Sequence, residues 1–438
     1  MQISSQTPLW HPCTQMKHHE NFPPLHIISG SGVWLSDGKK RYLDGISSWW
    51  VNLFGHANKT IAKALSKQAK ILEHVLLAGF THPQVLELSE NLLDLLPKEF
   101  TKCFYADNGS SGIEIALKMC LHHSQIKGQK RELFLTLENS YHGETLGALS
   151  VSDMGLYKSP YSALTTKHLS IKLPQNNLNQ ELGQELNEED ALKQLEKMLD
   201  LHGHNICGFI LEPLLQCAGG MNFYPVSFLQ KACALVRKYE IDIIFDEVAT
   251  GFGRLGEMFA FEIAGVVPDY LVLSKGITGG FLPLSVVITN ERVFEAFLDN
   301  KFEKGFLHSH SYTGNALSCA CANATLSIFK DQNIIAKNKL TSNYIAKKLQ
   351  SLDSKIITNK RFLGMVFAFD IRSSKNNNPR EIGRAFYELA LKRGVILRPL
   401  LNTIYFMPPY IIKKSEIDFV FNVISETLHE LEKNTSLF

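Results

Sequence analysis

The chain has 438 residues, of which 45% are hydrophobic and 20% are charged, and its formal net charge at pH 7 is +2. A chain of this length exceeds the size at which one hydrophobic core stops growing, so we expect more than one lobe. The small net charge provides no basic field for nucleic acid, which favours a small-molecule partner. No apolar stretch reaches the roughly 20 residues that a membrane-spanning helix needs.

The eight cysteines are scattered through apolar segments, and none belongs to a CxxC pair. Cysteines in this pattern are typical of a reducing compartment. Residues 1–6 lack the basic region and apolar stretch of a signal peptide. We therefore expect a cytoplasmic protein.

Six short apolar runs are predicted to be β-strands. In chain order they are 102–106, 132–137, 207–211, 241–245, 270–273 and 284–288. Between 207 and 288 the runs are separated by helix-like segments, a pattern typical of a parallel sheet with helices on both faces. The fold class is therefore α/β, with a large, mostly parallel sheet of six or more strands.

The rest of the chain is expected to form a smaller α+β unit. A helix rich in small residues is predicted over 314–329, and an acidic helix is predicted near 426–432. We expect three parts: an N-terminal segment over 1–60 that joins the small domain, a large domain over 61–315, and a C-terminal small domain over 316–438.

Two residues that close predicted strands carry the strongest chemical signal. Lys275 follows the run 270–273, and Asp246 follows the run 241–245. A desolvated lysine can attack an aldehyde, and a carboxylate against a pyridine nitrogen keeps that nitrogen protonated, as a pyridoxal phosphate (PLP) enzyme requires. Glu247 should face the opposite side of the strand from Asp246, so only one of the two can meet a ring. Taken alone, a surface lysine and a solvated acidic pair are alternatives.

A candidate phosphate site lies between a predicted strand and a predicted helix. Gly109 and Ser110 precede a helical pattern that begins at Ile113. Glycine lets the backbone approach an anion closely, and a helix N-terminus favours negative charge. The alternative is a capping box formed by Ser111 and Glu114, which needs no ligand.

Three other segments carry candidate contacts to a cofactor or substrate. Tyr141 follows a predicted strand and either stacks on a flat ring or packs in the core. The adjacent Trp49 and Trp50 predict an aromatic wall for an apolar substrate, although one of them could pack in the core. Arg398, held extended by the proline after it, either pairs with a substrate carboxylate through two parallel hydrogen bonds or lies on the surface.

The segment His308-Ser309-His310-Ser311 lies close in sequence to Cys319 and Cys321. The two cysteines are two positions apart on a predicted helix and point away from each other, which argues against a shared metal ion. A hydroxyl-rich loop that contacts phosphate fits the segment better. We expect no metal site.

Four of these segments together resemble a known family. They are Gly109-Ser110, Tyr141-His142-Gly143, the run 246–254 and Ser274-Lys275-Gly276. Over nearly its whole length the chain is similar to the class III, fold type I, PLP-dependent aminotransferases. The resemblance implies PLP as the cofactor, a large PLP-binding domain, and a smaller α+β domain built from the two chain ends.

Three further features are similar to the members of this class that aminate a long-chain keto acid in biotin biosynthesis. They are Trp10-His11-Pro12, Ser47-Ser48-Trp49-Trp50 and Met407-Pro408-Pro409-Tyr410. Ala249 agrees, since many ω-aminotransferases have glutamine at that position. The resemblance thus implies a biotin-pathway aminotransferase.

By the same resemblance, Lys275 is the Schiff-base lysine and moves the proton as general base and acid. Asp246 is the partner of the pyridine nitrogen, Gly109 and Ser110 hold the phosphate, and Tyr141 stacks on the ring.

The substrate and partner contacts are implied in the same way. The residues that would line the keto-acid pocket are Trp49, Tyr141, Lys275, Ser309 and Arg398. Arg398 would pair with the substrate carboxylate. His310 and Ser311 would reach the phosphate bound in the neighbouring subunit, which implies a homodimer with shared active sites.

Cys13 departs from the family pattern and leaves the amino donor open. It stands where the motif His-Pro-Tyr-Thr usually has a tyrosine that is thought to stack on the donor's adenine. Cysteine has no aromatic face, so lysine is an alternative to S-adenosylmethionine. Three rival functions are another class III ω-aminotransferase for ornithine-like or γ-amino substrates, an aminomutase, and a PLP-sensing regulator. For the regulator, we expect the segment before Trp10 to be too short for a helix-turn-helix.

Overall fold

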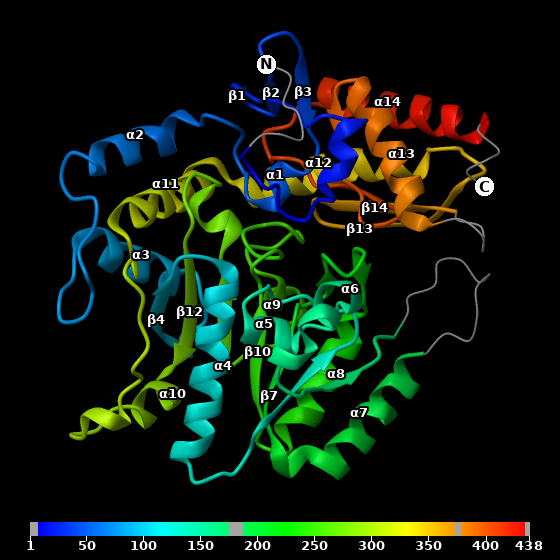
Figure 1. Ribbon diagram of the computed structural model, residues 1–438. Helices are drawn as coiled ribbons and strands as arrows, with labels where there is room; N and C mark the ends of the chain where they lie inside the picture. Colours follow the sequence, from blue (N-terminus) through cyan, green and yellow to red (C-terminus); the bar gives the residue numbers. More distant parts are fainter. Residues whose placement is uncertain (1–7, 175–186, 373–377, 434–438) are drawn as a thin grey trace.

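The computed structural model describes residues 8–174, 187–372 and 378–433. Its largest element is a seven-stranded sheet in the lower part of Figure 1, with strand order β4-β12-β11-β10-β7-β5-β6. The strands are β4 (Phe100–Ala106), β5 (Leu133–Leu137), β6 (Leu169–Ile171), β7 (Ile206–Leu211), β10 (Asp242–Asp246), β11 (Tyr270–Leu273) and β12 (Ser285–Asn290). All six predicted strands are therefore present, each within two residues of its expected ends.

The sheet is mostly parallel, which confirms the predicted α/β fold class. Strands β6, β5, β7, β10 and β11 pair in parallel, whereas β12 runs antiparallel to both β11 and β4. Strand β6 was not predicted, because three residues are too few to establish a periodicity.

Helices cover both faces of this sheet. Because successive strand residues face opposite sides, Ile244 packs in the cluster that contains α4 (Gly109–Ile126), and its neighbour Ile243 packs in the cluster that contains α8 (Val226–Arg237). Both residues are fully buried. Strand β10 is therefore apolar on both sides between Asp242, where it begins, and Asp246, where it ends.

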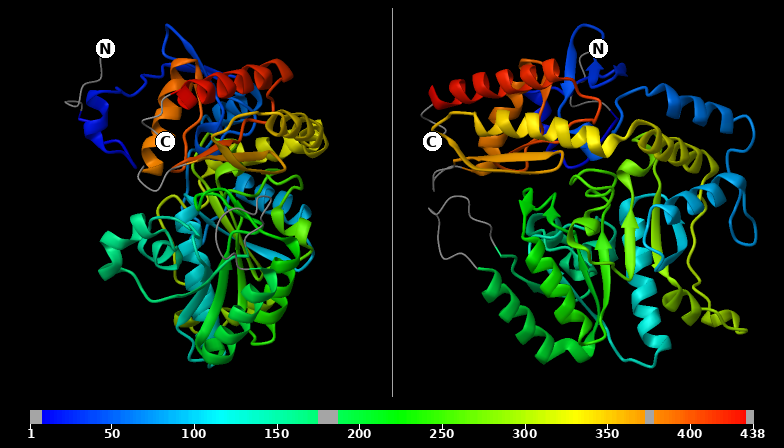
Figure 2. Two further views of the ribbon diagram at one scale, coloured as in Figure 1. Left: turned by 90° about the vertical axis from the view of Figure 1, so that its right-hand side faces the viewer. Right: turned by 180° about the vertical axis from the view of Figure 1, so that it is seen from behind.

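Two smaller sheets lie in the upper part of Figure 1. The strands of the first are β1 (Ser29–Ser31), β2 (Trp34–Ser36), β3 (Arg41–Asp44) and β15 (Val395–Ile396), and those of the second are β13 (Ile357–Leu363), β14 (Val366–Ile371) and β16 (Thr403–Phe406). Since β15 pairs in parallel with β3, the two ends of the chain share a sheet. Figure 2 shows the blue N-terminal strands beside the orange and red C-terminal elements in both views. The division of the chain at residues 60 and 315 stays a prediction.

The remaining elements connect or cover these sheets. They are α1 (Ser47–Trp50), α2 (Lys59–Gln68), α3 (Pro83–Asp94), α5 (Leu146–Val151), α6 (Gly155–Lys158), α7 (Glu188–His202), β8 (Leu215–Gln216), β9 (Asn222–Phe223), α9 (Ala260–Ala264), α10 (Glu291–Ala296), α11 (Ala316–Gln332), α12 (Ile334–Gln350), α13 (Pro379–Lys392) and α14 (Lys414–Lys433). Helix α11 begins two residues after the start of the helix predicted over 314–329, and α14 contains the helix predicted near 426–432. Among the helices that the structure describes, none is long and apolar enough to cross a lipid bilayer.

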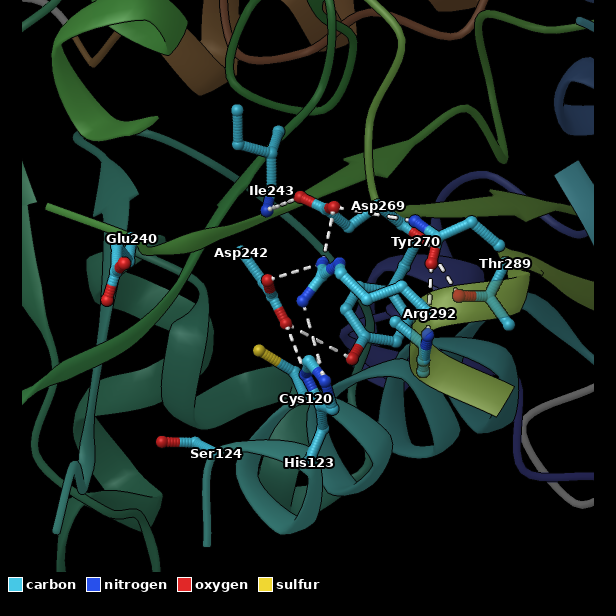
Figure 3. Close-up of polar contacts among 12 residues, drawn as sticks. Cys120, His123, Ser124, Glu240, Asp242, Ile243, Asp269, Tyr270, Thr289 and Arg292 are labelled. Carbon is cyan, nitrogen blue, oxygen red and sulfur yellow. Dashed lines mark hydrogen bonds and ion pairs between the residues drawn. The ribbon is translucent and has the colours of Figure 1, made fainter. Parts of the chain in front are cut away.

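A polar network, in which His123 and Asp242 are buried and Arg292 is exposed, ties the amino end of β10 to its surroundings (Figure 3). Asp242 accepts a hydrogen bond from His123 Nδ1 of α4 at 2.8 Å and pairs with Arg292 of α10 at 2.8 Å. Arg292 also reaches Asp269 at 2.7 Å. The network lies at the end of β10 opposite to Asp246, so it supports the sheet at a distance from the candidate site.

Candidate active site

A cavity of about 740 Å³ lies where several parallel strands of the large sheet end. Ligands of open α/β sheets bind at this edge, outside the carboxyl ends of the strands. The sequence-predicted residues that line it are Cys13, Trp49, Gly109, Ser110, Tyr141, Asp246 and Lys275. Four predicted site residues are absent from this lining: Ser309, His310, Ser311 and Arg398.

Lys275 is the first residue of a short 3-10 turn, η4 (Lys275–Thr278), that follows β11. Its φ of +44° is in the left-handed region, which residues with a Cβ rarely adopt. The side-chain nitrogen lies 4.8 Å from the centre of the Trp50 ring. Burial lowers the pKa of Lys275, and the nearby Asp246 partly opposes this. The lysine therefore lies in the cavity with a larger share of neutral amine than a surface lysine has.

Asp246 and Glu247 face opposite sides of the chain, as the alternation along a strand requires. Asp246 lines the cavity, and its Oδ2 accepts a hydrogen bond from the buried His142 Nδ1 at 2.8 Å. Glu247 instead accepts the backbone N–H groups of Ala260 and Phe261 at 2.7 and 2.8 Å. Burial raises the pKa of Glu247 to about 8. Asp246 is thus the one of the two that can meet a ligand in the cavity.

The sequence analysis assigned no role to two buried residues of the site, His142 and Glu212. His142, next to Tyr141, fixes the Asp246 carboxylate by the hydrogen bond described above. Glu212 directly follows β7, lines the cavity, and accepts the backbone N–H groups of Tyr141 at 3.1 Å and Cys217 at 3.0 Å. Burial raises the pKa of Glu212 to about 7. The signal for Glu212 was available, since a carboxylate after an apolar run is what singled out Asp246.

The candidate phosphate site is the N-terminus of α4. The helix begins at Gly109, four residues earlier than predicted, because Asn108 caps it by accepting the Ser111 N–H at 3.0 Å. The capping-box alternative is wrong, since Glu114 instead accepts the N–H groups of Gly147 and Ala148 in α5. The N–H groups of the first helical turn have no partner within the helix, and the helix dipole favours an anion there.

The loop that carries Tyr141 packs against this helix start. Gly143 has a φ of +130°, and a Cβ at this position would overlap the Ser110 side chain, so only glycine permits the approach. Ser110 Oγ also lies 2.7 Å from Thr145 Oγ1. The Tyr141 hydroxyl donates to Glu144 at 3.1 Å, and burial raises the pKa of Tyr141. Tyr141 therefore lies on the cavity wall, and the alternative of a core aromatic is wrong.

The two tryptophans form one side of the cavity, and Arg398 packs against one of them. Trp50 is buried with 4% of its surface exposed, and Trp49 is 39% exposed. The Arg398 guanidinium lies 4.8 Å from the centre of the Trp49 ring and donates to the carbonyl oxygen of Cys13 at 3.4 Å. Arg398 thus contacts two residues that line the cavity, Trp49 and Cys13, but does not line the cavity itself.

Ser309, His310 and Ser311 lie outside the cavity of their own chain. The His310 N–H donates to Thr313 Oγ1 at 3.2 Å, and His74 Nε2 donates to the carbonyl oxygen of Ser311 at 2.5 Å. Their implied role toward a neighbouring subunit stays a prediction. Within the described ranges, no group of three or more metal-binding side chains is placed to hold an ion.

The α/β fold and a cavity that contains Lys275 and Asp246 are typical of a PLP-dependent aminotransferase, and comparison with known proteins agrees with this class. The model of the family "Aminotransferase class-III" matches residues 15–428, and the chain belongs to this family. This confirms the resemblance stated from the motifs. The chain is similar to the adenosylmethionine-8-amino-7-oxononanoate aminotransferase of Helicobacter pylori, with 49% identity over 97% of each chain.

Two solved structures have the same fold. The adenosylmethionine-8-amino-7-oxononanoate aminotransferase of Methanocaldococcus jannaschii superposes with a TM-score of 0.90 at 32% identity, covering 97% of both chains. An amine transaminase from an uncultivated Pseudomonas species, solved in its PLP-bound form, superposes with a TM-score of 0.91 at 27% identity, covering 97% of this chain and 99% of the other.

Proposed function

We propose that this chain is a PLP-dependent aminotransferase that converts 8-amino-7-oxononanoate to 7,8-diaminononanoate in biotin biosynthesis, with S-adenosylmethionine as the amino donor. The observation that carries the proposal is that Lys275 and Asp246 line the same cavity, beside a wall of two tryptophans. The 49% identity to the Helicobacter pylori adenosylmethionine-8-amino-7-oxononanoate aminotransferase, over 97% of each chain, supports the choice of substrate.

The residues of the cavity fit PLP. The first turn of α4, with Gly109 and Ser110, would hold the phosphate, and the closely packed loop would bring Tyr141 over the ring. Asp246, held by His142, would lie against the pyridine nitrogen, and Lys275 would hold the cofactor covalently. When bound, PLP supplies an electron sink for the negative charge that develops on the substrate carbon.

The side chains of the site would move one proton and exclude water. Because the pKa of Lys275 is lowered, its Nζ can accept a proton from the carbon that bears the donor's amino group and can later return it. His142 Nδ1, donating to Asp246 Oδ2, keeps that carboxylate oriented. Trp49 and Trp50 would cover the aliphatic chain of the keto acid, and Arg398 would pair with its carboxylate.

The donor side of the cavity supports a second candidate. Cys13 lines the cavity where the family motif has tyrosine, and it offers no aromatic face for an adenine. The same amination with lysine as the donor is therefore the alternative.

The assembly and location are also part of the proposal. His310 and Ser311 would complete the phosphate site of the neighbouring subunit, since neither lines the cavity of its own chain. The enzyme would thus be a homodimer with shared sites. It would work in the cytoplasm on small molecules and bind no nucleic acid, in keeping with a net charge of +2.

The decisive experiment supplies the PLP-loaded protein with 8-amino-7-oxononanoate and either S-adenosylmethionine or lysine, and measures 7,8-diaminononanoate by mass spectrometry. We expect product with S-adenosylmethionine and none from the Lys275→Ala variant. Product with lysine alone would select the alternative donor. No product with either donor would refute the proposed substrate.

A further inference from the structure

One wall of the cavity has an unusual backbone. Ser47, Ser48, Trp49 and Trp50, which form α1, have φ values of +51°, +47°, +67° and +75°. Four successive left-handed residues without a glycine are unfavourable, because each Cβ crowds its own backbone. Such a conformation persists only where its surroundings hold it. We call this segment the left-handed turn.

A buried carboxylate reaches the middle of the left-handed turn. Asp44, only 1% exposed, accepts hydrogen bonds from Ser48 Oγ at 2.8 Å and from the Ile46 N–H at 3.2 Å. His56 Nε2 lies 3.0 Å from the same carboxylate, and Asn52 Nδ2 lies 3.1 Å from His56 Nδ1. Neither Asp44 nor His56 lines the cavity.

The ends of the turn are held by other contacts. Ser47 Oγ donates to the carbonyl oxygen of Met407 at 2.8 Å, and the buried Arg254 donates to the carbonyl oxygen of Trp50 at 3.2 Å. These contacts hold Ser47 and Trp50 and leave the middle of the turn free. Asp44 holds the middle through its hydrogen bond from the Ser48 side chain, next to Trp49. Burial raises the pKa of Asp44, but hydrogen bonds from His56 and Ser48 outweigh it and leave the pKa below its ordinary value.

We infer that Asp44, paired with His56, is a positioning residue of the substrate site: through the Ser48 hydroxyl it holds the left-handed turn that presents Trp49 to Arg398 and Trp50 to Lys275. The two rings lie 4.8 Å from the Arg398 guanidinium and 4.8 Å from the Lys275 amine. A shift of this turn would therefore move both tryptophan rings at once, Trp49 relative to Arg398 and Trp50 relative to Lys275. The kinetic part of the inference rests on the proposed function, whereas the orientation of the tryptophans does not.

The test compares two buried Asp-His pairs. Asp44→Asn removes an acceptor at the turn. Asp242→Asn removes one from another Asp-His hydrogen bond, made with His123 at the far end of β10, where Asp242 also pairs with Arg292 (Figure 3). We expect Asp44→Asn to raise the KM for the keto acid about tenfold with kcat changed less than about threefold, because a displaced wall weakens binding in ground and transition states alike. Asp242→Asn should lower the Tm and leave KM unchanged.

A second readout needs neither cofactor nor turnover. In a Trp10→Phe/Trp34→Phe background, the fluorescence of the cofactor-free protein reports only Trp49 and Trp50, since the chain has four tryptophans. Asp44→Asn should shift the emission and increase quenching by acrylamide, and Asp242→Asn should do neither.

Ser48→Ala covers the case in which Asp44→Asn does not fold. It should reproduce both effects, and the double variant should be no worse than Asp44→Asn alone, because the two side chains act through one hydrogen bond. Unchanged emission and unchanged KM in Ser48→Ala, or effects of Asp242→Asn equal to those of Asp44→Asn, would overturn the inference. If the parent protein does not aminate the keto acid, the proposed function fails, and the fluorescence comparison still decides the role of Asp44.

Discussion

The hydrogen bond between His142 and Asp246 gives a quantitative prediction for His142→Leu. The bond is 2.8 Å long and His142 is 3% exposed, so leucine leaves Asp246 Oδ2 without this donor in a buried setting. A hydrogen bond to a charged group contributes about 1.5–3 kcal/mol. If all of it serves to hold Asp246 against the pyridine nitrogen, kcat falls by about 10-fold to about 150-fold.

The matched control is His123→Leu, which removes a hydrogen bond of the same length to Asp242 from a residue that is 2% exposed. Both variants should lose stability, measured as free energy of unfolding. Only His142→Leu should lower kcat and the affinity for PLP, measured by single-turnover kinetics and by titration of the cofactor-free protein. A kcat within twofold of wild type in His142→Leu would refute the role given to this bond.

Three further predictions follow from other parts of the site. Gly143→Ala should weaken PLP binding at least about fivefold, because a residue with a Cβ in this sparsely populated backbone region costs about 1–3 kcal/mol and its Cβ meets Ser110; equal affinity in a PLP titration would contradict this. Cys13→Tyr should lower the KM for S-adenosylmethionine by about twofold to tenfold through ring stacking, and an unchanged KM would remove Cys13 from the donor site. Glu247 has its pKa raised from 4.5 to about 8, so its neutral form stabilises the fold fully below pH 4.5 and this contribution is lost as pH rises toward 8. Glu247→Gln cannot titrate and should therefore show a smaller fall in Tm between pH 5 and pH 8; parallel Tm curves would contradict the assignment.

The strands of the large sheet, and the pair Lys275 and Asp246, were predictable because the signals for them are local in the sequence. Apolar runs such as 270–273 have the length of a strand, and their order along the chain indicated a parallel sheet. The alternation of side chains along a strand also predicted that only one of Asp246 and Glu247 meets the ligand.

Other features depend on residues far apart in the sequence. The segment at Ser47 contains no glycine, and nothing local predicts its left-handed backbone, which is held by Arg254 and by the carbonyl of Met407. In the same way, Glu114 lies three residues after Ser111 as a capping box requires, but the N–H groups of α5 take its carboxylate. Tertiary contacts thus override the local pattern at both places.

The most direct measurement is the position at which PLP becomes attached when the loaded protein is reduced with borohydride and its peptides are mapped by mass spectrometry. We expect the pyridoxyl group on Lys275, and we expect prior incubation with S-adenosylmethionine to prevent the labelling, because the donor's amine then replaces the lysine. Two results would contradict the proposed aminotransferase site. One is a label on a different lysine residue. The other is labelling of Lys275 that is not decreased by prior incubation with either S-adenosylmethionine or free lysine.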